Sequence, residues 1–253
     1  MTNHVDRPGH IDTQEWAQRE KLALCYRLVD FFGWTETIFN HISARVPGPE
    51  HYYLVNPFGL NYNEVTAANL LKVDLDGNKV DDSEYDANPA GFALHSAVHG
   101  HREDIHCLIH THTTPISAIA QKQGGFDCNN FYGAQLFGRV AYHQFEGITL
   151  FADEKVRMLE SLQDRHILVL RNHGVAVGER SIEKAFFLLW TVQRAAEIQC
   201  LADSMRGDDV VIADDIRRKC TDLTAQLIRD DDFAVKFFQA MVRKMQAAQA
   251  RRA

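Results

Sequence analysis

Residues 105–112 read Ile-His-Cys-Leu-Ile-His-Thr-His, an apolar run of strand length that ends in two histidines one residue apart. Alternate residues of a strand point to one face, so His110 and His112 can converge near the end of the strand, while Ile105, Cys107 and Ile109 face the other way. Imidazole nitrogens are common ligands of divalent transition metals. The stretch therefore predicts a buried strand whose last residues offer part of a metal site.

A third candidate ligand lies much later in the chain. Arg171-Asn172-His173-Gly174 follows a second buried run, residues 166–170, and precedes a return strand at residues 175–177. Ligands from distant segments commonly meet where strands end in tight turns. We expect His173 to complete a three-imidazole site with His110 and His112. The alternative is that these are packing histidines, since a chain with 13 histidines also contains coincidental pairs.

The remaining pattern predicts several helices and short strands around this centre. Apolar spacing predicts helices at about 13–32, 92–99 and 151–162, a short one beginning at Pro115, and longer ones at about 181–198 and 214–245. Strands are expected at residues 52–55 and 71–75, the second turning at Asp76-Gly77-Asn78. Some of the connections between strands have hairpin length and others contain a helix, which favours helices layered on a mixed or antiparallel sheet.

Composition indicates one globular domain without a nucleic-acid or membrane partner. The chain has 253 residues and a net charge of −7, so it would on average repel nucleic acid and anionic lipid. The apolar segments are shorter than the ~20 residues that span a bilayer. Five cysteines without paired spacing are typical of reduced thiols in the cytoplasm. We expect a single domain over residues 1–253, with a core at about 16–205 and a C-terminal helical extension at about 206–250.

Several motifs together resemble the class II aldolase/adducin family over about residues 16–205. They are Asn40-His41-Ile42-Ser43-Ala44-Arg45, Asn56-Pro57-Phe58-Gly59-Leu60, Gly91-Phe92-Ala93-Leu94-His95-Ser96, His110-Thr111-His112 and Arg171-Asn172-His173-Gly174. The resemblance implies an α/β fold with three α/β/α layers around a central mixed, largely antiparallel sheet. It further implies a divalent metal ion on His110, His112 and His173, with Zn²⁺ favoured and Fe²⁺, Mn²⁺ or Co²⁺ as alternatives, and a ring-shaped homotetramer.

The sequence departs from the sugar-phosphate aldolases of that family at two places. Their Ser-Ser-Glu segment, which contacts phosphate and supplies a catalytic carboxylate, aligns here with Pro89-Ala90-Gly91, so the carboxylate is missing. Their Gly-Asn phosphate loop aligns with Phe39-Asn40, where a bulky side chain hinders close approach of the backbone to phosphate. These features resemble the adducin-like branch, without the long tail of animal adducins, and predict a small non-phosphorylated substrate.

Three candidate catalytic residues remain, each with an alternative role. His95 lies one helical turn after Gly91 and is a candidate general acid or base, or else a histidine bonded to a neighbouring carbonyl. Tyr132 aligns loosely with a proton-donating tyrosine of the family's aldolases, or else anchors an interface. Glu146 could approach the site or orient a ligand histidine, or else lie on the surface.

A polar segment offers candidate substrate-binding residues. Asn40, Ser43 and Arg45 could bind a substrate carboxylate, with arginine suited to a bidentate grip, or else could join a loop to the sheet. His99 is expected to face solvent, because it forms a pair with His95 without a third ligand. Phe58 is expected either to line a pocket or to pack on the core.

Three hypotheses for function follow. The leading one is a metal-dependent lyase that performs aldol-type cleavage or decarboxylation through a metal-stabilised enolate, on a small carbonyl or hydroxy-acid substrate. The second is a non-heme iron oxygenase, because three imidazoles with open positions can also hold Fe(II). The third is a non-catalytic, adducin-like scaffold or binding protein.

Overall fold

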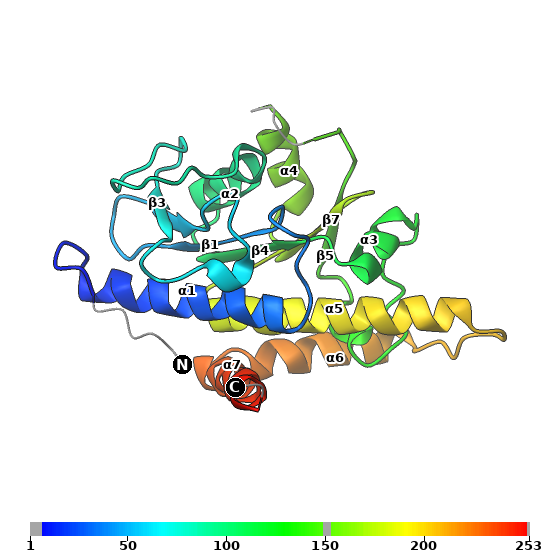
Figure 1. Cartoon of the computed structure of the whole chain (residues 1–253). Coiled ribbons are helices and arrows are strands. Elements are labelled where there is room, and N and C mark those ends of the chain that lie inside the picture. Colours follow the sequence, from blue (N-terminus) through cyan, green and yellow to red (C-terminus); the bar gives the residue numbers. More distant parts are fainter. Residues whose placement is uncertain (1–6, 149–152, 252–253) are drawn as a thin grey trace.

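A seven-stranded sheet forms the centre of the molecule (Figure 1). The computed structural model describes residues 7–148 and 153–251, and of residues 89–92 only the backbone. The strand order is β3-β2-β1-β4-β7-β6-β5, and β5 and β6 are the parallel pair in this otherwise antiparallel sheet. The strands are β1 (His41–Arg45), β2 (Tyr53–Val55), β3 (Leu71–Val73), β4 (Cys107–Thr111), β5 (Val140–His143), β6 (Ile167–Leu170) and β7 (Gly174–Glu179).

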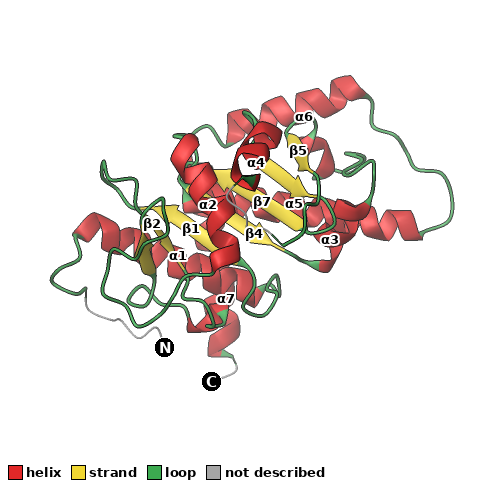
Figure 2. Ribbon diagram, turned by 90° about the horizontal axis from the view of Figure 1, so that it is seen from above, coloured by secondary structure: helices red, strands yellow, loops and turns green. Residues whose placement is uncertain are grey.

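Helices cover both faces of the sheet, as the family resemblance implied. The helices are α1 (Thr13–Phe31), α2 (Pro89–His101), α3 (Thr114–Gln121), α4 (Glu154–Leu162), α5 (Ile182–Ser204), α6 (Asp214–Leu227) and α7 (Asp231–Ala250), with short 3-10 turns η1 (Tyr62–Glu64) and η2 (Gly133–Leu136). Helices α2 and α4 lie over one face, whereas α1 and α5 lie under the other (Figures 1 and 2). The fold is therefore an α/β fold with three layers, the expected class.

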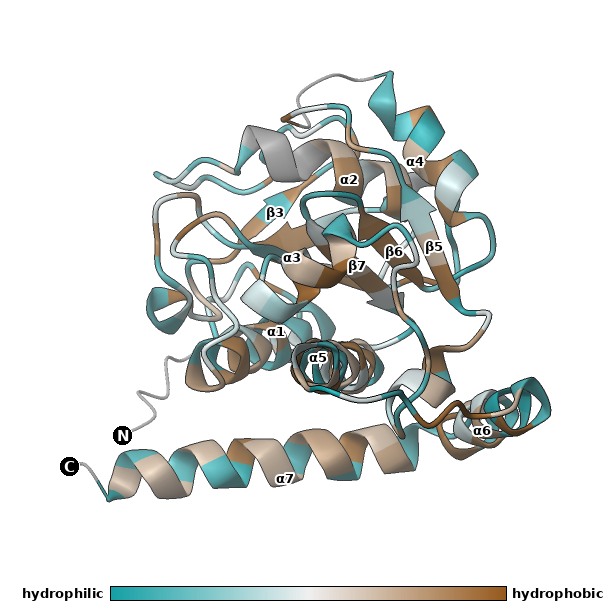
Figure 3. Cartoon of the chain, turned by 90° about the vertical axis from the view of Figure 1, so that its right-hand side faces the viewer, coloured by the Kyte–Doolittle hydropathy of each residue, from teal (hydrophilic) through white to brown (hydrophobic). Residues whose placement is uncertain are grey.

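Helices α6 and α7 add an outer layer beyond α5. Figure 3 shows α5 between the strands and α7. Polar residues of α7, among them Lys236, Gln239 and Arg243, are exposed. Phe186 of α5 packs against Phe237 and Phe238 of α7, with ring centroids 6.2 and 5.6 Å apart. In the described part of the chain, no helix is long and apolar enough to cross a membrane.

The alternation predicted for β4 places its residues in two separate core clusters, one on each face of the sheet. Cys107 and Ile109 pack among residues of α1 and α5, and Leu108 packs with residues of α2 and α4. Ile105 is an exception, because it joins the cluster of Leu108. It lies before the strand, in a turn where its N–H donates to the Arg102 carbonyl, so strand alternation does not apply to it. His110 lies on the side of the sheet that α2 and α4 cover.

Side-chain caps explain where the two helices beneath the sheet begin. Asp12 precedes α1 and accepts hydrogen bonds from the backbone N–H groups of Gln14 and Glu15. Ser181 precedes α5, as predicted, and accepts from the N–H of Lys184. Such caps satisfy N–H groups that the first turn of a helix leaves without partners.

The structure corrects several predicted elements. The helix expected at about 214–245 is two helices, with a break around Arg229. The Lys184 ammonium donates to the Arg229 carbonyl and also pairs with the Asp231 carboxylate at 2.7 Å. This tertiary anchor holds the break, and acids in the first turn of α7 favour a new helix start there. Strand β3 ends at Val73, two residues earlier than expected, because Asp74 begins the turn.

Two strands were missed, and part of one helix cannot be compared. Strands β1, His-Ile-Ser-Ala-Arg, and β5, Val-Ala-Tyr-His, mix polar residues with small apolar ones and lack the apolar run that marks β4 and β6. The predicted start of α4 at Phe151 lies outside the described residues, and the described helix begins at Glu154.

Candidate metal centre

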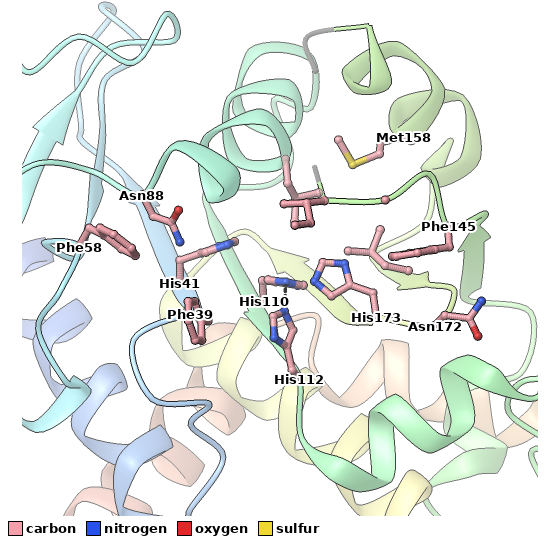
Figure 4. A pocket seen from close by; sticks show the side chains of 14 residues that line it. Phe39, His41, Phe58, Asn88, His110, His112, Phe145, Met158, Asn172 and His173 are labelled. Carbon is pink, nitrogen blue, oxygen red and sulfur yellow. Dashed lines mark hydrogen bonds between the residues drawn. The ribbon is translucent and has the colours of Figure 1, made fainter. Parts of the chain in front are cut away.

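Three histidines from two distant segments meet at one end of the sheet. His110 is the penultimate residue of β4, His112 follows that strand, and His173 immediately precedes β7. Because β4 and β7 are antiparallel, with Thr111 opposite Val175, the end of one strand lies beside the beginning of the other. The ring centroids are 4.5 to 4.9 Å apart, and one nitrogen from each ring lies within 4.8 Å of the others. Figure 4 shows the three rings turned toward one another.

The backbone around His173 lies unusually close to Thr111 and His112. Asn172 has φ +57°, a left-handed conformation that asparagine tolerates better than most residues. A Cβ on Gly174 would lie 2.4 Å from the Thr111 carbonyl oxygen and 2.9 Å from Cδ2 of His112. The turn therefore requires glycine at this position, for reasons of space.

A hydroxyl from α3 ties the two segments together. Ser117 Oγ lies 3.1 Å from the carbonyl oxygen of His112 and 2.9 Å from that of His173, and it donates its proton to this pair. The backbone positions of two candidate ligands are thereby set relative to each other.

The three rings are electrically suited to bind a cation. Burial, followed by the neighbouring rings His112 and His41, holds the pKa of His110 well below 6.5. Burial lowers the pKa of His112 to about 4 and also lowers that of His173. All three imidazoles are therefore neutral at pH 7, the protonation state that ligates metals.

His110 also has its ring fixed in one tautomer. Its Nδ1 lies 2.9 Å from the Val175 carbonyl oxygen and must donate a proton there, so Nε2 keeps its lone pair. That Nε2 lies 2.6 Å from Nε2 of His112. A backbone carbonyl that orients a histidine in this way is a common partner of metal ligands. The residues present thus fit a divalent ion such as zinc.

The three histidines form the floor of a cavity of about 390 Å³ (Figure 4). Its other walls are largely aromatic and aliphatic, and they include Phe39, Phe58, Leu94, Phe145, Met158 and Leu170. Phe58 thus lines a pocket, one of the two roles expected for it. The cavity gives a small molecule access to the candidate metal ligands.

His41 is a pocket residue that sequence reasoning missed. It lines the cavity, its ring stacks on His110 with centroids 4.8 Å apart, and burial lowers its pKa well below 6.5. The signal was present, because His41 lies in the segment Asn40 to Arg45. Recognising it required the β1 to β4 pairing, which places His41 opposite His110.

A buried hydrogen-bonded chain continues from His41 away from the cavity. His41 Nδ1 lies 2.6 Å from His95 Nε2, His95 Nδ1 is hydrogen-bonded to Ser43 Oγ, and Ser43 Oγ lies 2.6 Å from His99 Nε2. His99 is fully buried, so the expectation that it faces solvent is wrong. Helix α2 packs on β1, which turns that helix face into the core. His95 does not line the cavity and reaches it through His41.

The three predicted substrate-binding residues make structural contacts in this chain. Asn40 donates to the Trp34 carbonyl, and Arg45 donates to the carbonyls of His99 and Arg102. Ser43 belongs to the buried chain. These contacts are the ones expected if the segment joins loops to the sheet. Substrate binding by Asn40, Ser43 and Arg45 stays a prediction.

Tyr132 lies apart from the three rings, and Glu146 lies near His173 but is engaged in an ion pair. Tyr132 packs with the core cluster of α1 and α5, on the other face of the sheet, and Arg194 lies 5.8 Å from its ring centroid. Glu146 shares a small recess with His173 but pairs with Arg157, whose Nε lies 2.8 Å from its Oε1. The Arg157 hydrogen bond lowers the pKa of Glu146. Their catalytic roles stay predictions.

Comparison with known proteins gives consistent matches over the sheet and the cavity. The family model described as class II aldolase and adducin N-terminal domain matches residues 20–200. A Pseudomonas aeruginosa protein, provisionally named as an aldolase class 2 protein, is 41% identical over 226 residues, covering 89% of this chain and 86% of its own. Rat alpha-adducin is 41% identical over 209 residues, which are 80% of this chain and 28% of the adducin.

Solved structures support the same relationship. The crystal structure of an aldolase II superfamily protein from Pseudomonas syringae superposes with a TM-score of 0.90 at 36% sequence identity. The superposition covers 94% of this chain and 96% of that one.

Proposed function

Because the chain belongs to the class II aldolase and adducin N-terminal domain family, we propose that it is a metal-dependent lyase. The proposed reaction is aldol-type cleavage or decarboxylation of a small non-phosphorylated carbonyl or hydroxy-acid compound. The observation that carries the proposal is the convergence of three neutral imidazoles, His110, His112 and His173, on the floor of an accessible cavity. They would hold a divalent ion, with Zn²⁺ favoured and Fe²⁺, Mn²⁺ or Co²⁺ as alternatives.

A divalent ion, when bound, supplies Lewis acidity toward a substrate oxygen. The chain itself must move the proton. Among the described residues that line the cavity, one titratable side chain lies beside the three candidate ligands, and that side chain is His41. His95 holds its Nδ1, which leaves Nε2 as the nitrogen to exchange a proton with substrate. His41 thus takes the place of the carboxylate missing at Gly91, and His95 positions it.

Two other functions remain as alternatives. Three imidazoles also suit Fe(II) for oxygen chemistry, so iron in the purified protein together with oxygen consumption would favour an oxygenase. The likeness to adducin favours a non-catalytic scaffold. That reading gains if removal of the metal lowers only the melting temperature and leaves ligand binding intact.

Assembly and location belong to the proposal as well. We propose a cytoplasmic homotetramer, by analogy with the family and because the five cysteines are free thiols. Analytical ultracentrifugation tests the tetramer directly.

The decisive experiment joins metal analysis to a matched pair of variants. Metal content is measured in the purified protein, and hydroxy acids, keto acids and aldehydes are screened for cleavage or carbon dioxide release. His112→Ala should lose metal and turnover while remaining folded, because the change removes one ligand without opening the core. His106→Ala, at an exposed histidine of the same segment, should retain both. Full activity of His112→Ala, or a wild-type protein that stays metal-free in saturating zinc, manganese and ferrous salts, would overturn the proposal.

A further inference from the structure

We infer that the substrate carries an uncharged aryl group, held by the aromatic rim of the cavity, next to the oxygen atoms that face the histidines. This inference rests on the proposed function and specifies its substrate class, an aryl-substituted 2-keto or 2-hydroxy acid or aldehyde. We define the aromatic rim as Phe39, Phe58 and Phe145.

The aromatic rim is unusually open to solvent. Phe39 and Phe145 are each 54% exposed and Phe58 is 39% exposed, although all three line one cavity. Figure 4 shows them arranged around the three histidine rings. Exposed aromatic side chains that line one cavity mark a binding site more often than they serve stability. An apolar group placed among them would remove apolar surface from water, which is favourable.

The deeper wall is also apolar. Leu94, Met158 and Leu170 line the cavity and are themselves 1 to 5% exposed. Methionine adapts to flat rings and makes favourable contacts with them. An aryl group therefore finds apolar partners at both depths of the cavity.

Charge in the lining argues against an anionic substituent. None of the described residues that line the cavity is a lysine, arginine, aspartate or glutamate. Arg171, a neighbour of Asn172, donates to the carbonyls of Lys122 and Gln123 and lies 4.2 Å from the Tyr142 ring centroid. Arg157 is paired with Glu146. A phosphate in the described part of the cavity would therefore lack the cationic partner that it normally requires.

The size of the cavity also favours a substrate of this aryl-substituted class. A volume of about 390 Å³ lies within the range of sites for small organic ligands. A substrate with only a methyl substituent would leave the aromatic rim in water. An aryl substituent would remove part of the aromatic rim from water.

The test compares three 2-keto acids that share one head group. Pyruvate, phenylpyruvate and 3-phosphohydroxypyruvate carry a methyl, a benzyl and a phosphorylated substituent. Their Kd values are measured by calorimetry on the full-length protein loaded with the metal found in it. We expect phenylpyruvate to bind about tenfold or more tightly than pyruvate, and 3-phosphohydroxypyruvate to bind no better than pyruvate.

Matched variants assign the preference to the aromatic rim. Phe39→Ala and Phe145→Ala should bring the ratio of the pyruvate and phenylpyruvate Kd values toward one. Leu223→Ala, which is equally exposed at 54% but lies on α6, should leave the ratio unchanged. Because these side chains are half exposed, the variants should fold, and circular dichroism with sedimentation verifies folding and assembly.

The possible outcomes distinguish the aryl inference from the lyase proposal. Equal Kd values for pyruvate and phenylpyruvate would overturn the aryl inference and leave the lyase proposal standing. Tighter binding of the phosphorylated acid would overturn both the aryl inference and the non-phosphorylated substrate class of the proposal. Dissociation of the oligomer by Phe39→Ala and Phe145→Ala, with an unchanged Kd ratio, would also overturn it and identify the aromatic rim as a subunit contact. Equal binding of phenylpyruvate to metal-free protein would instead contradict the lyase proposal.

Discussion

Replacing Gly174 by alanine should damage the candidate metal centre through steric contact alone. The added Cβ would lie 2.4 Å from the Thr111 carbonyl oxygen and 2.9 Å from Cδ2 of His112. An ordinary contact between carbon and oxygen is about 3.4 Å. The added Cβ and the Thr111 oxygen must therefore move apart by roughly 1 Å. Thr111 is paired with Val175 inside the sheet, so the turn and the His112 ring must yield.

The expected losses follow from this displacement. Over-packing of this kind costs about 1 to 3 kcal/mol of unfolding free energy, and each kcal/mol lowers Tm by about 2 to 4 °C in a chain of this size. Displacement of a ligand by its supporting shell lowers metal affinity by about 10- to 100-fold.

The assay is a competition titration of zinc against a chromogenic chelator, with thermal unfolding measured with and without zinc. Gly124→Ala is the matched control, since a Cβ there would have no heavy atom within 4 Å. A Gly174→Ala protein with wild-type Kd for zinc and wild-type Tm would refute the steric reasoning.

Two further predictions concern the supports of the site. Ser117→Ala should lower zinc affinity about tenfold in the same titration, because the variant loses the hydroxyl that donates to the His112 and His173 carbonyls. An unchanged Kd for zinc would show that this hydroxyl does not position the candidate ligands. Burial holds the pKa of His95 well below 6.5 and lowers that of His99 to about 3, so below pH 6.5 the unfolded chain binds protons that the folded chain does not. The free energy of unfolding of metal-free protein should therefore fall between pH 7.5 and 5, by about 2 kcal/mol for each ring. Urea denaturation measures this, and a flat profile would contradict it.

The parts of the fold that sequence alone predicted have a local cause. Strand β4, helix α5 and its cap at Ser181 depend on apolar periodicity and capping chemistry within one segment. The set of candidate ligands was also predictable, because His110 and His112 end a buried strand and His173 lies in the turn after another. The family motifs added the shape of the sheet, which the structure confirms.

Other features could not be read from local patterns. Strand β1 is short and polar, and its status depends on pairing with β2 and β4. The break between α6 and α7 is held by Lys184, which is distant in sequence. His99 has the sequence context of a surface residue, and the packing of α2 on β1 buries it.

The sequence by itself thus determined the chemistry available to the site, three imidazoles and no carboxylate at Gly91, because residue type and strand alternation are local properties. Only the tertiary structure decided which other side chains share the cavity. It brought His41 against His110 and separated Tyr132 from them, since these distances depend on strand pairing and layer packing across the whole chain. Pairing between distant segments has no periodic signature along the chain, and it determines which groups can act together.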